Sequence, residues 1–285
     1  MKPGSDELES SLSPPTFLID PPSGWPTLGL KELWEYRELL YFFTWRDIKV
    51  RYKQTALGAA WAIIQPFFMM LVFSLFFGRL AHVSSDGIPY PVFVYAGLLP
   101  WQLFSQSLVE SSNSLVTNER LINKVYFPRV CLPISAVIAA LVDFTIAFTI
   151  LILMMAFYGV RPTAAIVALP AFILLAACTA LAVGLWLSAF NARYRDVRYT
   201  INFLIQFWLF ATPVAYSSSL VPLRWRALYG LNPMAGVVEG FRWSLLGGSE
   251  APGPMLAVSV SMVVLLFIGG LYYFRRMEAE FADVI

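Results

Sequence analysis

The residues best suited to bind a charged ligand are four cations just ahead of the first long apolar run. They are Arg46, Lys49, Arg51 and Lys53, within the stretch RDIKVRYK. Arginine binds phosphate through two parallel N–H donors, and lysine binds it as a compact point charge. The stretch therefore predicts a substrate entrance that attracts an anion such as a lipid-linked diphosphate. The alternative is that these charges only fix the orientation of the helix that follows.

A single acid, Asp143, lies in an apolar run whose residues 130–160 carry no other charge. An acid at this depth in a membrane costs about 2.5–3.5 kcal/mol on insertion scales, so it requires a partner or a function. A structural role is favoured, in which a neighbouring Tyr, Ser, Thr or Gln binds the carboxylate. Contact with substrate in a pore and proton coupling are the alternatives, and the second is disfavoured because the other apolar runs offer no relay partner.

Several catalytic and nucleotide-binding motifs are missing from the sequence. It has no GxxxxGK[ST] loop for nucleotide phosphates, no HExxH metal motif and no GxSxG nucleophile elbow. Its one histidine, His82, and its two separate cysteines, Cys131 and Cys178, do not form a metal-ligand pattern. We expect no catalytic site, metal or cofactor in this chain, so energy would come from a partner or an ion gradient. The net charge of +2 gives no basis for a nucleic-acid partner.

The composition places these residues in a membrane protein. Apolar residues make up 58% of the chain and charged residues only 13%, whereas soluble domains carry about a quarter charged residues. Crossing a bilayer takes about 20 apolar residues in a helix. Irregular spans are excluded because they would leave backbone N–H and C=O groups unpaired in lipid. The fold prediction is an all-α membrane protein whose six transmembrane helices cover residues 56–78, 87–109, 130–158, 163–191, 199–220 and 252–274.

Lysine and arginine are concentrated on one side of these spans. Besides the first basic stretch, that side carries Arg120, Lys124, Arg129, Arg193, Arg195, Arg198, Arg275 and Arg276. The other side carries only Arg79, Arg161, Arg224, Arg226 and Arg242. The positive-inside rule therefore predicts cytoplasmic termini, as an even number of spans also requires. Residues 1–29 lack an apolar signal segment and are expected to form a disordered cytoplasmic tail.

Three further segments flank or interrupt the spans. Residues 30–45 combine a polar stripe with many aromatic rings, which predicts an amphipathic interface helix contacting membrane lipids, either as an anchor or as a collar at the entrance. The loop 114–128 predicts a short cytoplasmic helix able to dock on another protein, with an ordinary loop as the alternative. Residues 221–249 contain two short apolar pieces divided by Asn232-Pro233, which predicts re-entrant or surface-lying helices rather than a plain loop.

Aromatic residues make up 16% of the chain and crowd several spans. Sugars stack their C–H faces on aromatic rings, so a pore lined with rings would suit a sliding glycan, although packing against lipid explains many rings equally well. The pore-lining candidates are Trp61, Phe67, Phe68, Trp101, Phe104, Phe203 and Phe207.

Six stretches together resemble one family. They are RDIKVRYKQTALGAAWAIIQP, AGLLPWQLFSQSL, LINKVYFPRVCLPI, NARYRDVRY, TPVAYS and LNPMAGVVEGFRW, in this order between residues 46 and 243. They resemble the ABC-2 type permeases that export polysaccharides or polyol phosphates, the membrane components of O-antigen, capsule and teichoic acid exporters. The resemblance covers the chain from about residue 30 onward.

This resemblance implies a homodimer with two copies of an ABC ATPase subunit, which would bind ATP and Mg²⁺. It implies that residues 30–43 form a gate helix, that residues 221–246 help to close the outer mouth, and that rings of the first and fifth helices line the pore. It also implies a coupling helix that contacts the ATPase, made of Thr117, Asn118, Glu119, Arg120, Leu121, Ile122, Asn123, Lys124 and Val125.

The expected function is therefore that of a transport subunit rather than an enzyme. It would move a polysaccharide linked to an undecaprenyl diphosphate-type lipid, with O-antigen as the first choice, across the bacterial inner membrane. Export of teichoic acid, capsule, lipids or drugs by the same fold is the nearest alternative. An ion-coupled flippase and a membrane glycosyltransferase or polymerase are alternatives from other classes.

Overall fold

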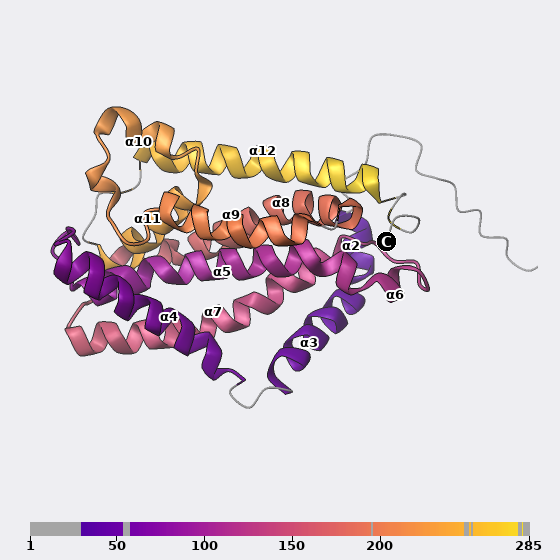
Figure 1. Cartoon of the computed structure of the whole chain (residues 1–285), viewed down its shortest axis with the longest axis horizontal. Coiled ribbons are helices and arrows are strands. Elements are labelled where there is room, and N and C mark those ends of the chain that lie inside the picture. Colours follow the sequence, from indigo (N-terminus) through magenta and orange to yellow (C-terminus); the bar gives the residue numbers. More distant parts are fainter. Residues whose placement is uncertain are drawn as a thin grey trace, which may run out of the picture.

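A computed structural model describes residues 30–53, 58–194, 196–247, 251, 253–278 and 281. Within these ranges every regular element is a helix, which confirms the predicted all-helical class. The long helices run roughly side by side along the longest axis of the molecule (Figure 1). The predicted tail, residues 1–29, and the predicted start of the first span at residue 56 lie outside the described ranges.

Five helical segments are long and apolar enough to cross a membrane. They are α4 (Ala60–Phe73) with the π-helical turn Ser74–Leu80, α5 (Tyr90–Thr117), α7 (Cys131–Tyr158), α8 (Leu169–Arg193) with the 3₁₀ turn Ala164–Ala168, and α12 (Gly253–Met277). These match the first, second, third, fourth and sixth predicted spans. The second was predicted to end at residue 109, but α5 continues to Thr117, and Glu110 within this extension pairs with Arg51.

The fifth predicted span, residues 199–220, is not one continuous helix. Helix α9 (Val197–Ala211) has 15 residues, a length of about 22 Å, whereas the hydrocarbon core of a bilayer is about 30 Å thick. Pro213 supplies no backbone N–H and disfavours a helical conformation at Thr212, so the helix stops there. Residues 212–217 are irregular and lead into a 3₁₀ turn, Ser218–Leu220.

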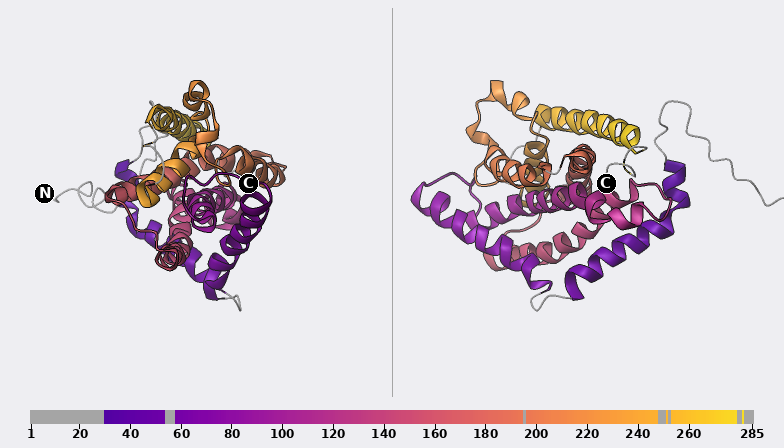
Figure 2. Two further views of the ribbon diagram at one scale, coloured as in Figure 1. Left: turned by 90° about the vertical axis from the view of Figure 1, so that its left-hand side faces the viewer. Right: turned by 45° about the vertical axis from the view of Figure 1, so that its right-hand side comes forward.

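Helix α5 is the centre of the bundle. It packs against α4, α7, α8 and α9, and a view along the long axis shows it enclosed by the other helices (Figure 2). Small residues allow close approach, as is common in membrane helix packing. A Cβ atom on Gly184 of α8 would collide with the side chain of Ser111 on α5, so glycine is what lets these two helices meet.

The two ends of the bundle differ in what they carry. One end, here called the α6 end, holds α2 (Leu30–Glu35), the start of α3 (Arg37–Lys53), α6 (Glu119–Ile122) and the end of α12 (Figure 1). The predicted interface helix is thus split at residue 36. Its second part extends beyond residue 45 to Lys53, so that the basic stretch lies on the same helix.

An apolar cluster at the α6 end joins segments that are distant in sequence. Its buried members include Phe43, Ile122, Phe127, Phe274 and Phe281. The rings of Phe43 on α3 and Phe127 after α6 lie 5.4 Å apart between centroids. This cluster therefore fixes α3, the α6 segment and the end of α12 against one another.

The opposite end, here called the α10 end, holds α10 (Leu223–Tyr229) and the end of α11 (Pro233–Leu246), beside the 3₁₀ turn Ala164–Ala168. Two helices divided at Asn232-Pro233 were predicted here, and the Asn232 side chain caps the second by accepting from the Met234 N–H at 3.1 Å. Most of α11 is buried against α5, α8 and α12, whereas α10 packs on α12 alone of the long helices and is largely exposed. Residues 248–250 at the end of the predicted segment lie outside the described ranges.

Candidate functional site

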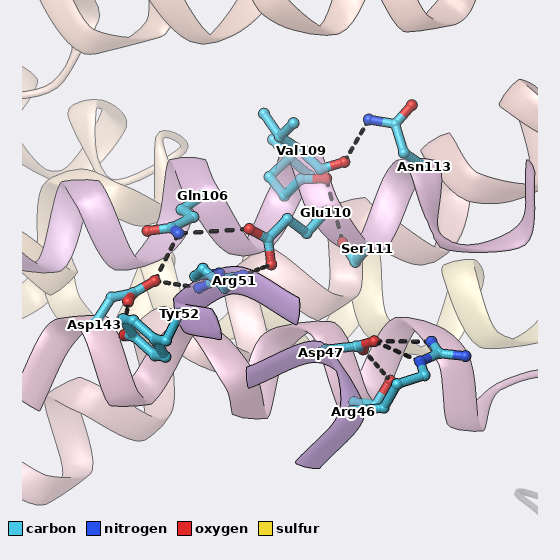
Figure 3. A network of polar contacts seen from close by, with 12 residues as sticks. Arg46, Asp47, Arg51, Tyr52, Gln106, Val109, Glu110, Ser111, Asn113 and Asp143 are labelled. Atoms are coloured by element: carbon cyan, nitrogen blue, oxygen red, sulfur yellow. Dashed lines mark hydrogen bonds and ion pairs between the residues drawn. The ribbon is translucent and has the colours of Figure 1, made fainter. Parts of the chain in front are cut away.

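Five polar side chains from three helices meet where α3 crosses α5 and α7 (Figure 3). Arg51 and Tyr52 come from the last turn of α3, Gln106 and Glu110 from α5, and Asp143 from α7. Gln106 and Glu110 are four residues apart and therefore lie on one face of their helix. This group is called the Arg51 cluster below.

The Arg51 guanidinium forms ion pairs with two carboxylates. One terminal nitrogen donates to Asp143 and the other to Glu110. The amide nitrogen of Gln106 donates to the same oxygen of Asp143 at 2.7 Å and to Glu110 at 3.4 Å, while the Tyr52 hydroxyl donates to the second oxygen of Asp143. Both oxygens of Asp143 thus accept hydrogen bonds.

Burial makes these contacts matter for the position of α3. Asp143 is only 7% exposed, and a buried acid is stable as an anion only when it is paired and hydrogen-bonded. Burial raises the pKa of the Tyr52 hydroxyl, and the hydrogen bond to Asp143 raises it further. Tyr52 therefore remains a protonated donor at neutral pH, and the cluster ties the end of α3 to both α5 and α7.

The structure gives Asp143 two of the partner types predicted for a structural role, a tyrosine and a glutamine. It adds a partner that the sequence analysis missed, Arg51, which also pairs with a second overlooked acid, Glu110. Glu110 was overlooked because it lies one residue beyond the predicted end of the second span. Arg51 was assigned to the entrance, or to fixing the orientation of the following helix. The structure instead places it between Glu110 of α5 and Asp143 of α7 (Figure 3).

The basic stretch of α3 is divided between two kinds of environment. Arg46 pairs with its neighbour Asp47 at 2.8 Å, and Arg51 belongs to the cluster. Lys49 and Lys53 are exposed, lie one helical turn apart, and have no ion pair with any described residue. The Lys49 ammonium lies 5.3 Å from the centroid of the Trp45 ring, which is also exposed. Of the four predicted entrance cations, Lys49 and Lys53 are thus the exposed ones that make no ion pair with a described residue.

The candidate pore rings also separate into two groups. Trp101 and Phe104 of α5 are buried within the chain, and the Phe104 ring packs on Trp208 of α9 at 5.0 Å between centroids. This places both away from any surface that a second copy could share. The other candidates are exposed on α4 and α9, and they are Trp61, Phe67, Phe68, Phe203 and Phe207.

The predicted coupling segment consists of the end of α5, the short helix α6 and the turn that follows. Ile122 is buried in the apolar cluster of the α6 end, and Leu121 packs against it. Asn123, Lys124 and Val125 are exposed, and so is Tyr126 beyond the predicted boundary. The segment therefore has an inner side fixed to the bundle and an outer tip.

A second buried charged pair, Glu239 and Arg242 on α11, was not predicted. Arg242 was placed on the outer side, within the predicted re-entrant or surface-lying helices and without a partner; it is 2% exposed and lies 3.8 Å from the Glu239 carboxylate. The spacing of three residues between opposite charges on an otherwise apolar helix was the signal available in the sequence. Among the residues that the structure describes, no three His, Cys, Asp or Glu side chains gather as a metal site would require.

Long apolar helices packed around one buried helix, with ionisable side chains paired where they meet, are the architecture of a polytopic membrane protein. The chain belongs to the ABC-2 type transporter family, whose model matches residues 38–246. This confirms the resemblance found in the sequence.

Two groups of relatives are similar over most of their length. An O-antigen export system permease protein RfbA of Myxococcus xanthus is 32% identical over 90% of this chain and 98% of its own. The protein of the same name from Klebsiella pneumoniae is 26% identical over 87% of this chain and 95% of its own. The polysialic acid transport protein KpsM of Escherichia coli is 26% identical over 82% of this chain and 92% of its own.

Proposed function

We propose that this chain is the transmembrane subunit of an ATP-driven exporter that moves a lipid-linked polysaccharide, in first place O-antigen, across the bacterial inner membrane. The observation that carries the proposal is the similarity to a protein named as an O-antigen export permease, which extends over 98% of that protein. The family model covers residues 38–246, which run from α3 to the end of α11.

The energy would come from two copies of a separate ABC ATPase subunit that binds ATP and Mg²⁺. In this proposal the α6 end faces the cytoplasm, because it carries Arg120, Lys124, Arg129 and Arg275. The exposed tip at Asn123–Val125 would contact the ATPase, while Ile122 fixes the same segment to the apolar cluster. A push on the tip would then reach α3 through Phe127 and Phe43.

The entrance for the lipid-linked substrate would lie along the exposed face of α3. Lys49 and Lys53 would bind the diphosphate of an undecaprenyl diphosphate-type lipid as two point charges. Trp45, one turn before Lys49, would contact the interface of the membrane. Arg51 would not bind this ligand but would hold α3 in place through Asp143 and Glu110.

The transport path would form between two copies of the chain. Phe203 and Phe207 are one turn apart on α9 and are 71% and 68% exposed, so they form a continuous aromatic face. Trp61, Phe67 and Phe68 give α4 exposed rings as well. In a homodimer these faces would supply rings on which a sugar chain can stack and slide, and α10 and α11 would help to close the outer mouth.

The nearest alternative is export of a different polymer by the same mechanism. The similarity to a polysialic acid transport protein favours capsule as the second candidate, and teichoic acid, lipid or drug export remain further uses of the same family fold. Family membership argues against an ion-coupled flippase and against a membrane glycosyltransferase.

The test is deletion of the gene in its own host, followed by complementation with the wild-type gene. The expected result is loss of surface O-antigen together with accumulation of lipid-linked polymer inside the cell. Loss of capsule with normal O-antigen would move the assignment to the second candidate. Normal amounts of both polymers at the surface, with nothing accumulated inside, would refute the proposal.

A further inference from the structure

A stretch of non-helical backbone lies buried in the bundle directly after α9. It covers residues 212–217 (TPVAYS), in which Thr212, Val214 and Ser217 are at most 1% exposed. Inside a membrane protein such backbone is tolerated only where protein groups or enclosed water satisfy its carbonyls. The carbonyl oxygens of this segment must therefore be bound by donors from neighbouring elements.

Arg242 of α11 supplies three of these contacts with one side chain. Its Nη1 donates to the carbonyls of Pro213 at 2.7 Å and Tyr216 at 3.2 Å, and its Nη2 donates to the carbonyl of Val214. Its Nε donates to the carbonyl of Phe93 at 3.1 Å, near the start of α5. The guanidinium also lies 3.7 Å from the centroid of the Phe93 ring. Arg242 thus joins the irregular segment to the central helix.

The space that holds this guanidinium is built into α5. A Cβ atom on Gly97 would occupy the position of Arg242 Nη2 and would approach the Val214 carbonyl within 3.1 Å. Glycine is therefore required at this point of the helix. This steric requirement is independent of the hydrogen bonds of Arg242, because it concerns the space beside Gly97 on α5 whereas Arg242 belongs to α11.

Neighbouring groups complete the arrangement. Glu239, one turn before Arg242, balances the charge at 3.8 Å and accepts from the Ser218 N–H at 2.8 Å. The Tyr90 hydroxyl donates to the carbonyl of Ala215 at 2.6 Å. Together these side chains bind the segment from Pro213 to Ser218 almost residue by residue.

Clustered carbonyls at the end of an interrupted membrane helix are the ligands with which ion-coupled transporters hold Na⁺. In this protein the guanidinium cation of Arg242 lies among such carbonyls. We propose that Arg242 is a positioning residue whose guanidinium substitutes for a bound metal cation among the carbonyls of Pro213, Val214 and Tyr216. It thereby fixes the course of residues 212–217 after Pro213 has ended α9.

The test uses the full-length protein purified in detergent, where both faces are accessible and the outcome does not depend on orientation or cargo. Cys131 and Cys178 are replaced by alanine, and Ala215→Cys places one thiol in the buried segment. In this background Arg242→Ala is expected to raise the rate of maleimide labelling about tenfold or more, since bonds to a charged donor are lost. Millimolar guanidinium should restore slow labelling, whereas Na⁺ and K⁺ should not.

Two matched pairs separate this role from a general loss of packing. Arg224→Ala removes an exposed arginine of α10 and should leave labelling unchanged. Gly97→Ala keeps Arg242 but displaces its guanidinium, so it should raise labelling, whereas Gly184→Ala introduces an equally close helix contact at Ser111 and should not. If Arg242→Ala fails to fold, the glycine pair decides. Unchanged labelling in folded Gly97→Ala or Arg242→Ala protein, or protection of Arg242→Ala by Na⁺ as well as by guanidinium, would overturn the proposal.

Discussion

Arg51 on α3 and Asp143 on α7 form an ion pair although 92 residues separate them in the sequence. Near its other end α3 inserts Phe43 into the apolar cluster of the α6 end, against Phe127. The helix is therefore fixed at two points, by charge between α5 and α7 and by aromatic packing beside α6. Any movement of the α6 segment must act on the helix that presents Lys49 and Lys53.

Replacing Asp143 by alanine should destabilise the protein strongly. It leaves the Tyr52 hydroxyl and the Gln106 amide without their shared acceptor and removes one of the carboxylates on Arg51. Breaking one partner of a buried ion pair costs about 3–5 kcal/mol, so the free energy of unfolding in detergent should fall by about that amount. Arg51→Gln combined with Asp143→Asn should lose less than the sum of the two single changes, because the residues interact directly.

The matched control is Asp47→Asn, which removes an acid from a partly exposed pair with Arg46 on the same helix. Pairs of that kind contribute about 0–1 kcal/mol, so the loss should be correspondingly small. Equal effects of Asp47→Asn and Asp143→Asn would show that the Arg51 cluster has no special part in holding α3.

Reversing the charge of both exposed lysines should impair export without affecting folding. Lys49→Glu with Lys53→Glu would repel a diphosphate while leaving the contacts of Arg46 and Arg51 intact. The measurements are surface polysaccharide in cells and melting temperature of the purified protein. Arg224→Glu, an equally exposed charge reversal at the α10 end, is the control, and accessibility labelling must show unchanged membrane insertion. Normal export by the doubly reversed protein would remove the entrance from α3.

The lengths of the apolar runs predicted most of the fold. Runs of about 20 uncharged residues have few alternatives in a membrane, so five helices long and apolar enough to cross one, and the division of residues 221–249 at Asn232-Pro233, were predicted from sequence. The predicted fifth span, residues 199–220, extends beyond the end of α9 at Ala211. Hydropathy reports which side chains are apolar, but it does not report which groups bind the backbone carbonyls. The apolar residues after Pro213 are buried, but they are held by Arg242 and Tyr90 rather than by helix hydrogen bonds.

The candidate site was predictable only in part for a related reason. The sequence showed that Asp143 needed a partner, and tyrosine and glutamine were named as types. Which residues supply those groups depends on how α3 crosses α5 and α7, which no local pattern determines. The same holds for the division of one basic stretch into a paired Arg51 and exposed Lys49 and Lys53.

The coupling segment should respond differently at its inner side and its tip. Asn123→Ala, Lys124→Ala and Val125→Ala together change exposed side chains, so they should leave the melting temperature unchanged while lowering ATPase stimulation and export. Ile122→Ala opens a cavity in the apolar cluster and should cost about 2–5 kcal/mol of stability. The measurement is ATPase activity of the assembled complex alongside melting. Full stimulation by the triple alanine variant would place the ATPase contact elsewhere.

The aromatic candidates can be divided by the same comparison of transport with stability. Phe203 and Phe207 face outward from α9, so replacing both with alanine removes little packing within the chain and should leave the melting temperature within a few degrees of wild type. Export should fall several-fold if these rings carry the sugar chain between two copies. Phe104→Ala removes a fully buried ring beside Trp208 and should lower the free energy of unfolding by about 3–5 kcal/mol.

Tryptophan at positions 203 and 207 should preserve export, because it keeps a stacking surface, whereas leucine, which keeps only apolar bulk, should not. If leucine supports export as well as tryptophan does, these rings face lipid or the partner copy and the transport path lies along other residues.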